Sequence, residues 1–211
     1  MKEDSIRILK KIVIIIPAVL LLPLGLSLYI FADIGADVLT SFQQGVAKIT
    51  NIGIGNVVTI FNVTVLVVFL FINRRLINIG SVMMVLATGP LITLYFNILT
   101  LIFPYKFSFF INLLLVFLGT IFVAVAISIF VTVNLGVSPV DMIVITISRL
   151  VQKSYGVGMY IFFGITLILA LIVGGKIGIG TIINLLFLGK LSDFFIKIFK
   201  PYILRMTDMT V

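Results

Sequence analysis

Long apolar runs separated by short polar segments dominate the hydrophobic pattern of this chain. A transmembrane helix needs about 20 mostly apolar residues to cross about 30 Å of hydrocarbon. Six runs meet or approach that length, and they predict membrane spans over residues 12–31, 56–72, 77–101, 107–133, 156–173 and 177–199. The pattern therefore predicts an all-α polytopic membrane protein.

The last of these runs differs from the other five because it contains charge. Lys190 and Asp193 lie inside it, and only residues 177–189 are free of charged side chains. Since charge in hydrocarbon is costly, this span needs a partner or a lysine stem that reaches the interface. The i, i+3 spacing also predicts that Lys190 and Asp193 pair with each other.

Two further segments, residues 37–48 and 139–152, are too polar or too short to be ordinary spans. Each opens with a helix-start signal: Asp37 in the first, and Ser138 followed by Pro139 in the second. We expect both to form short helices that dip into the bilayer from one face or lie along it.

An internal duplication relates the two halves of the chain. Residues 79–89 and 179–189 both read Ile-Gly-(Ser/Thr), an apolar run, and Gly, and residues 27–35 similarly match 128–136. The order of the matched blocks is the same in both halves. The sequence thus predicts a first repeat over 1–101 and a second over 102–211, with one short helix in each.

The number of crossings decides how the repeats are related. Three spans per half would invert the second repeat, whereas four per half, with the short helices crossing, would make the repeats parallel. We favour six spans and inversion because Asp37, Gln43, Gln44 and Asp141 would be costly in lipid.

Composition and charge place the chain in a membrane without counting its spans. Apolar residues make up 62% and charged residues 10% of the chain, which carries a net charge of +8. With six spans and both ends inside, eleven basic residues lie on the inner side and three on the outer; eight spans give the same ratio. Both counts predict cytoplasmic termini. The inner set in the six-span arrangement is Lys2, Arg7, Lys10, Lys11, Arg74, Arg75, Arg149, Lys153, Lys197, Lys200 and Arg205, and the outer set is Lys48, Lys106 and Lys176.

The absence of cysteine and histidine excludes disulfides and thiolate metal sites and removes the commonest general base. No nucleophile elbow or phosphate loop is present, so we expect no enzyme, catalytic residue, metal or cofactor. The basic residues lie at span ends, where they meet anionic lipid headgroups, so no nucleic-acid partner is expected.

Candidate site residues come from the duplicated glycines and from polar groups near the membrane. In inverted-repeat transporters the solute binds where broken helices of the two repeats meet. The candidate hinge or broken-helix positions are Gly35, Gly136, Pro139, Gly80, Gly180, Gly89 and Gly189. The candidate solute-binding residues are Asp141, Asp33, Asn134, Asp37, Ser138, Ser81, Thr181 and Asn184.

Structural explanations compete with these assignments. Small residues also let membrane helices pack closely, buried asparagines also form interhelical hydrogen bonds, and Asp141 also fits a helix cap. Asp33, Asp37 and Asp141 would form a carboxylate cluster if the two short helices met.

The second half carries motifs that resemble a known family. Residues 135–141 read Leu-Gly-Val-Ser-Pro-Val-Asp, residues 155–158 read Tyr-Gly-Val-Gly, and Ile-Gly-Thr follows at 179–181. Together they resemble the YitT/YczE/YyaS group of bacterial multi-pass membrane proteins over nearly the whole chain. The first half departs from the pattern, with Val38 and Thr40 where Pro139 and Asp141 stand. The resemblance implies a polytopic protein of the bacterial plasma membrane.

Three functions fit these features. The first is a carrier of a small solute or ion that works by alternating access of the two repeats. The second is a substrate-capture subunit that needs an energising partner, although the small-residue pair Ala32 and Ala36 lies toward the predicted outer side. The third is a regulatory or scaffolding membrane protein. A homo-oligomer fits any of them.

Overall fold

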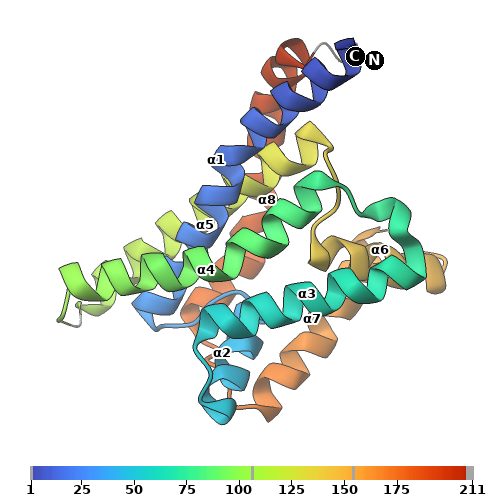
Figure 1. Ribbon diagram of the computed structural model, residues 1–211. Coiled ribbons are helices and arrows are strands. Elements are labelled where there is room, and N and C mark those ends of the chain that lie inside the picture. Colours follow the sequence, from blue (N-terminus) through green and yellow to red (C-terminus); the bar gives the residue numbers. More distant parts are fainter. Residues whose placement is uncertain (1, 106, 154, 208–211) are drawn as a thin grey trace.

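The computed structural model of the chain describes residues 2–105, 107–153 and 155–207. Within these ranges the fold is entirely helical (Figure 1). The elements are α1 (Lys2–Ala32), α2 (Val38–Thr50), α3 (Ile54–Asn73), the 3-10 turn η1 (Arg74–Leu76), α4 (Ile79–Ile102), α5 (Phe109–Val133), α6 (Pro139–Leu150), α7 (Tyr155–Ile172) and α8 (Ile179–Met206).

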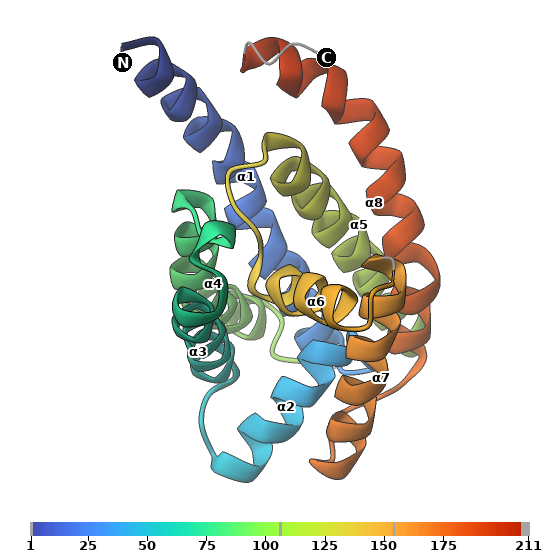
Figure 2. The ribbon, with the colours of Figure 1, turned by 90° about the vertical axis from the view of Figure 1, so that its right-hand side faces the viewer.

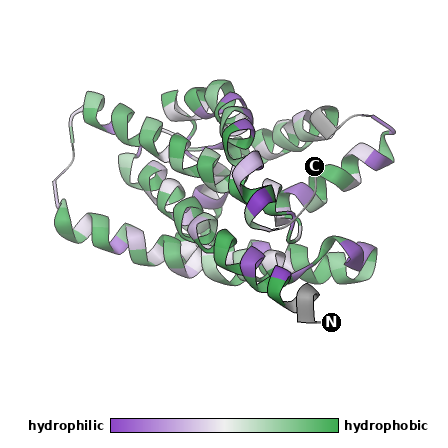
Figure 3. Cartoon of the chain, turned by 90° about the horizontal axis from the view of Figure 1, so that it is seen from above, coloured by the Kyte–Doolittle hydropathy of each residue, from purple (hydrophilic) through white to green (hydrophobic). Residues whose placement is uncertain are grey.

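Every helix expected from the hydrophobic pattern is present. Helices α1, α3, α4, α5 and α8 are long and apolar enough to cross a membrane, whereas α7 contributes a shorter apolar segment, Val157–Ile172. Helix α8 continues to Met206, beyond the predicted end at residue 199. Lys106, assigned to the outer side above, lies outside the described residues. The apolar helices indicate an integral membrane protein, and hydrophobic residues make up most of these helices (Figure 3).

Helices α1 and α5 form the centre of the molecule and run antiparallel to each other (Figures 1 and 2). They cross closely at Gly25 and Gly119, where a Cβ on Gly25 would lie 2.6 Å from the Gly119 carbonyl oxygen. Small residues permit such crossings because they let helix backbones approach. One core cluster surrounds this pair and includes Ile15, Ala18 and Phe130.

Two further long helices flank the central pair: α4 packs against α1, and α8 packs against α5. Helix α4 descends in Figure 1 whereas α8 ascends, so these two also run in opposite directions. The start of α1 and the end of α8 lie at the same end of the molecule (Figures 1 and 2).

The remaining helices pack unequally in the two halves. Helix α3 lies along α4, and a Cβ on Gly55 or Gly89 would overlap the facing helix. Helix α7 instead packs against α2 and α6. Accordingly, the glycine of α8 that matches Gly89, Gly189, has no atom within 4 Å of a Cβ placed there.

The predicted ion pair within α8 is wrong. Lys190 and Asp193 are both exposed, and neither forms an ion pair with any residue that the structure describes. The spacing of three residues permits contact, but no packed neighbour holds the two side chains together.

Candidate solute-binding site

The segment that follows α1 meets the start of α8. The Gly180 N–H donates to the Ile34 carbonyl at 3.1 Å, and the Gly178 N–H donates to Thr181 Oγ1 at 3.3 Å. Gly35 adopts a φ of +106°, a conformation that glycine tolerates. A Cβ on Gly180 would overlap the Gly35 backbone. Glycine at both positions is therefore what allows the helix start and the loop to touch.

A contact of the same kind joins the segment after α5 to the start of α4. The Gly80 N–H donates to the Leu135 carbonyl at 2.9 Å. Ser81 Oγ donates to the Val137 carbonyl at 2.7 Å and accepts from the Val137 N–H at 2.9 Å. Gly136 has a φ of +126°. These residues occupy the positions that match the first contact in the aligned halves.

The residues before the two glycine loops also match in backbone conformation. Asp33 and Asn134, which follow the last residues of α1 and α5, have φ values of 56° and 50°. Aspartate and asparagine are among the few residues that adopt this left-handed conformation readily. Their shared role at these positions is to end a helix.

The two short helices start with side-chain caps, as expected. Asp37 accepts from the Leu39 and Thr40 N–H groups at 3.1 Å each. Burial raises the pKa of the Asp37 carboxyl, and the hydrogen bonds from Thr40 and Leu39 oppose this effect. At α6, Ser138 Oγ accepts from the Asp141 N–H at 3.2 Å and lies 2.8 Å from Asp141 Oδ2. Asp141 thus belongs to the cap of α6.

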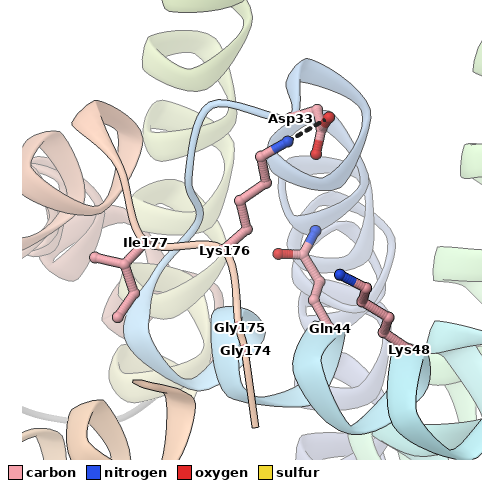
Figure 4. Close-up of a pocket in the computed structure, with 7 residues that line it drawn as sticks. All are labelled: Asp33, Gln44, Lys48, Gly174, Gly175, Lys176 and Ile177. Carbon is pink, nitrogen blue, oxygen red and sulfur yellow. Dashed lines mark ion pairs between the residues drawn. The ribbon is translucent and has the colours of Figure 1, made fainter. Parts of the chain in front are cut away.

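A charged pocket of about 510 Å³ opens beside the first glycine loop (Figure 4). Asp33 and Lys176 form an ion pair there at 2.6 Å, with 48% and 50% of their side chains exposed. Gln44 and Lys48 of α2 line the same pocket, and the Gln44 Oε1 is buried without a hydrogen-bond partner among the described residues. An unpaired buried acceptor is costly, so a small movement of the Gln44 side chain toward a donor in the pocket would be favourable.

The pocket wall opposite α2 is the chain between α7 and α8, and contacts with α2 hold it in place. Ser41 Oγ donates to the Lys176 carbonyl at 2.9 Å, and a Cβ on Gly175 would overlap the Ser41 carbonyl. Helix α2 follows the predicted first repeat's opening span, whereas residues 174–177 belong to the predicted second repeat. The pocket therefore lies between segments that are distant in sequence.

A second pocket, of about 640 Å³, shares Asp33 and Gln44 with the first. Its lining is largely apolar and includes an aromatic cluster: Phe31, Phe103 and Phe107 pack with ring centroids 5.2–6.5 Å apart. Asp33 and Gln44 thus lie between a charged and an aromatic compartment.

A buried polar network connects α1, α5 and α8 near the first contact. The Tyr29 hydroxyl donates to Asn184 Oδ1 at 2.6 Å, Thr120 Oγ1 lies 3.3 Å from the same oxygen, and Asn184 Nδ2 donates to the Gly180 carbonyl at 3.0 Å. Asn184 is fully engaged by these bonds, so its role here is interhelical.

The structure divides the predicted site residues into two groups. Asp33, Asp37, Thr181 and Asn184 lie near the first glycine contact, and Asn134, Ser138, Asp141 and Ser81 lie near the second. The predicted carboxylate cluster is wrong, since no group of three or more metal-ligating side chains occurs among the described residues. Only Asp33 of the eight lines either pocket.

Three residues that line the charged pocket were not among the binding candidates predicted from the sequence: Gln44, Lys48 and Lys176. Gln44 had a detectable signal, because its polarity was conspicuous in a membrane segment. The two lysines look like ordinary span-end residues, and only their position across from α1 makes them part of a site.

The small-residue pair Ala32 and Ala36 is not a docking surface. The two side chains are 1% and 0% exposed and pack in a core cluster with Tyr29.

Comparison with known proteins gives a family and one distant relative. A protein of Haemophilus influenzae described as uncharacterized is 24% identical over 189 residues, which cover 90% of this chain and 84% of that protein. No solved structure matches the chain. The model of a family of unknown function, DUF6198, matches residues 9–197, and the chain therefore belongs to that family.

Proposed function

We propose that this protein carries a small polar solute across the bacterial plasma membrane and that the solute binds between Asp33, Gln44, Lys48 and Lys176. The observation that supports this assignment best is the buried, unpartnered Gln44 Oε1 at the boundary between the two pockets. A donor in the pocket would give this oxygen a hydrogen bond after a small movement of the Gln44 side chain.

The charges of the pocket favour a solute that carries both signs. The Asp33 and Lys176 side chains are half exposed and already paired. A zwitterion can exchange partners with this pair, because its anionic group binds Lys176 or Lys48 while its cationic group binds Asp33. The adjoining aromatic compartment offers space for an apolar part of the same solute.

The proposed mechanism is alternating access by two inverted repeats. Support comes from the opposite directions of α1 and α5 and of α4 and α8, which are the matching spans of the two halves. The two glycine contacts add support, since each repeat's loop touches the other repeat's last long helix. In transporters of this design, the solute site lies between the repeats.

A sixth crossing by α7 completes this arrangement. The start of α1 and the end of α8 lie at the same end of the molecule, which requires an even number of crossings, and five helices are long enough to span. Helix α7 has no charged residue and contains the apolar segment Val157–Ile172, so it is the natural sixth.

Uptake into proteoliposomes tests the carrier proposal. A panel of radiolabelled zwitterions, cations and anions is offered to wild-type protein, and any transported compound is then offered to Asp33→Asn and Lys176→Gln. We expect saturable uptake of a zwitterion by the wild type and strong loss in both variants. Asp141→Asn, at the other glycine contact, is the control and keeps uptake.

Three results would contradict the proposal. Absence of uptake across the panel would overturn the carrier function. Binding without uptake would point to a substrate-capture subunit. Loss of uptake in Asp141→Asn with normal uptake in Asp33→Asn would move the site to the other contact.

A further inference from the structure

The outward face of α8 presents charge at a depth where lipid cannot solvate it. Lys190 and Asp193 stand 11 and 14 residues after Ile179, so at 1.5 Å per residue they lie about 17 and 21 Å along the helix. The exposed Asp33–Lys176 pair, just before α8, marks the polar boundary at that end. In hydrocarbon about 30 Å thick, both charges fall in the interior.

None of the residues that the structure describes covers this face. Helix α5 packs on the opposite side of α8, where Asn184 and Ser192 are buried. On the outward side Ile182, Leu185 and Leu186 are more than half exposed, and Gly189 has no neighbour within 4 Å of a Cβ placed there. We call this surface, Ile182, Leu185, Leu186, Gly189, Lys190 and Asp193, the α8 outer face.

Packing of α7 on the α8 outer face would leave Lys190 and Asp193 without partners. In the first half α3 covers Gly89 of α4, and α7 is the matching candidate for Gly189. However, α7 has no charged residue. It would bury Lys190 and Asp193 without supplying a partner for either, and a buried unpaired charge is strongly unfavourable.

We propose that a second copy of this chain covers the α8 outer face, with Lys190 of each copy paired to Asp193 of the other. A two-fold axis along the membrane normal brings the same face of two copies together, so one lysine and one aspartate per face are self-complementary. The two residues differ in depth by three residues, about 4.5 Å, which the lysine stem spans. Gly189 lets the two helices approach closely, and Leu185 and Leu186, one turn earlier in α8, supply apolar contact.

This interface does not depend on the proposed transport activity. The interface uses the face of α8 that points away from α5. The charged pocket is lined by residues outside α8, beside the loop that follows α1. The dimer can therefore be tested without knowing the solute.

Charge-reversal variants test the pairing. Their oligomeric state is measured in lipid nanodiscs or by single-molecule photobleaching in liposomes. The wild type is expected to be a dimer. Lys190→Asp and Asp193→Lys, which each place like charges on both copies, lose the dimer when expressed alone. Co-expressed, the two variants form a heterodimer, because one face is then wholly acidic and the other wholly basic.

Cysteine cross-linking tests the same surface without altering charge, and the natural chain has no cysteine. Leu186→Cys is expected to form an intermolecular disulfide under mild oxidation. The matched control is Leu86→Cys on α4, at the equivalent position of the first half and similarly exposed (60% against 57% for Leu186). It stays uncross-linked.

The proposal is overturned if the wild type is monomeric in bilayers, if co-expression fails to restore association, or if both cysteines cross-link equally. A monomer that associates only with a chain of different sequence overturns it as well.

Discussion

At the residue scale, buried hydrogen bonds add to the helix packing that joins the two halves of this protein. The clearest is the bond from the Tyr29 hydroxyl to Asn184 Oδ1, at 2.6 Å between buried side chains of α1 and α8. Without this bond the buried Tyr29 hydroxyl would lose its acceptor and Asn184 Oδ1 would keep only the longer bond from Thr120, so the pair stabilises the contact between distant segments.

Tyr29→Phe should lower the free energy of unfolding by about 0.5–1.5 kcal/mol, because Asn184 loses its shortest hydrogen bond while packing is preserved. Unfolding in mixed detergent micelles measures the change. Tyr105→Phe, at an 83% exposed tyrosine, is the control and leaves stability unaltered. Equal stability of both variants would show that the Asn184 bond has no net value.

The charged pocket yields a second prediction at this scale. Exchange of the Asp33 and Lys176 side chains, Asp33→Lys with Lys176→Asp, keeps an ion pair between α1 and the start of α8. Exposed ion pairs contribute only about 0–1 kcal/mol, and lysine in the left-handed conformation of position 33 costs about 1–2 kcal/mol, so the fold should be retained with lower stability. Solute affinity should fall, since the positive and negative ends of the pocket are reversed. Fluorescence-detected gel filtration and uptake measure the two effects, and unchanged uptake would make the pair purely structural.

At the scale of elements, the two glycine contacts determine how helices from different halves fit. The start of α8 reaches the loop after α1 only because Gly180 has no Cβ, and the start of α4 reaches the loop after α5 through Gly80. Gly180→Ala should therefore destabilise the fold by about 1–3 kcal/mol, because the added carbon overlaps the Gly35 backbone.

Gly164→Ala is the matched control for this substitution. Gly164 lies in α7 with no atom near a placed Cβ. Alanine there should leave stability unchanged or raise it by up to about 1 kcal/mol, owing to its better helix propensity. Thermal unfolding in detergent compares the two variants, and equal destabilisation would mean that the glycine contact is not tight.

Sequence reasoning predicted these elements well because each depends on local pattern. The boundaries of α2 and α6 followed from Asp37 and Ser138, which cap helices whatever the rest of the chain does. The predicted pairing of Lys190 with Asp193 failed because spacing along a helix permits a contact without enforcing it. The lysines of the charged pocket were missed because nothing local indicates that Lys176 faces Asp33.

At the scale of the whole molecule, the number of crossings sets the side of the membrane on which each loop lies. With six spans Arg75 lies on the cytoplasmic side and Tyr105 on the outer side; with eight spans these positions exchange sides. Both are exposed in the structure.

Single-cysteine labelling in intact cells distinguishes the two topologies, since the chain offers no competing cysteine. We expect an impermeant maleimide to label Tyr105→Cys from outside and to reach Arg75→Cys only after permeabilisation. The reverse pattern would support eight crossings and parallel repeats, and would remove the basis for alternating access.

The sequence by itself determined the solvent, the helices and their order. Apolar runs of membrane length and helix caps act through neighbouring residues, so hydrophobic pattern alone predicts them. Tertiary structure decided which helices touch, that Asp33 pairs with Lys176 around an unpartnered Gln44, and that α8 leaves two charges exposed. These features depend on contacts between residues far apart in the sequence, such as Asp33 and Lys176, which no local pattern encodes.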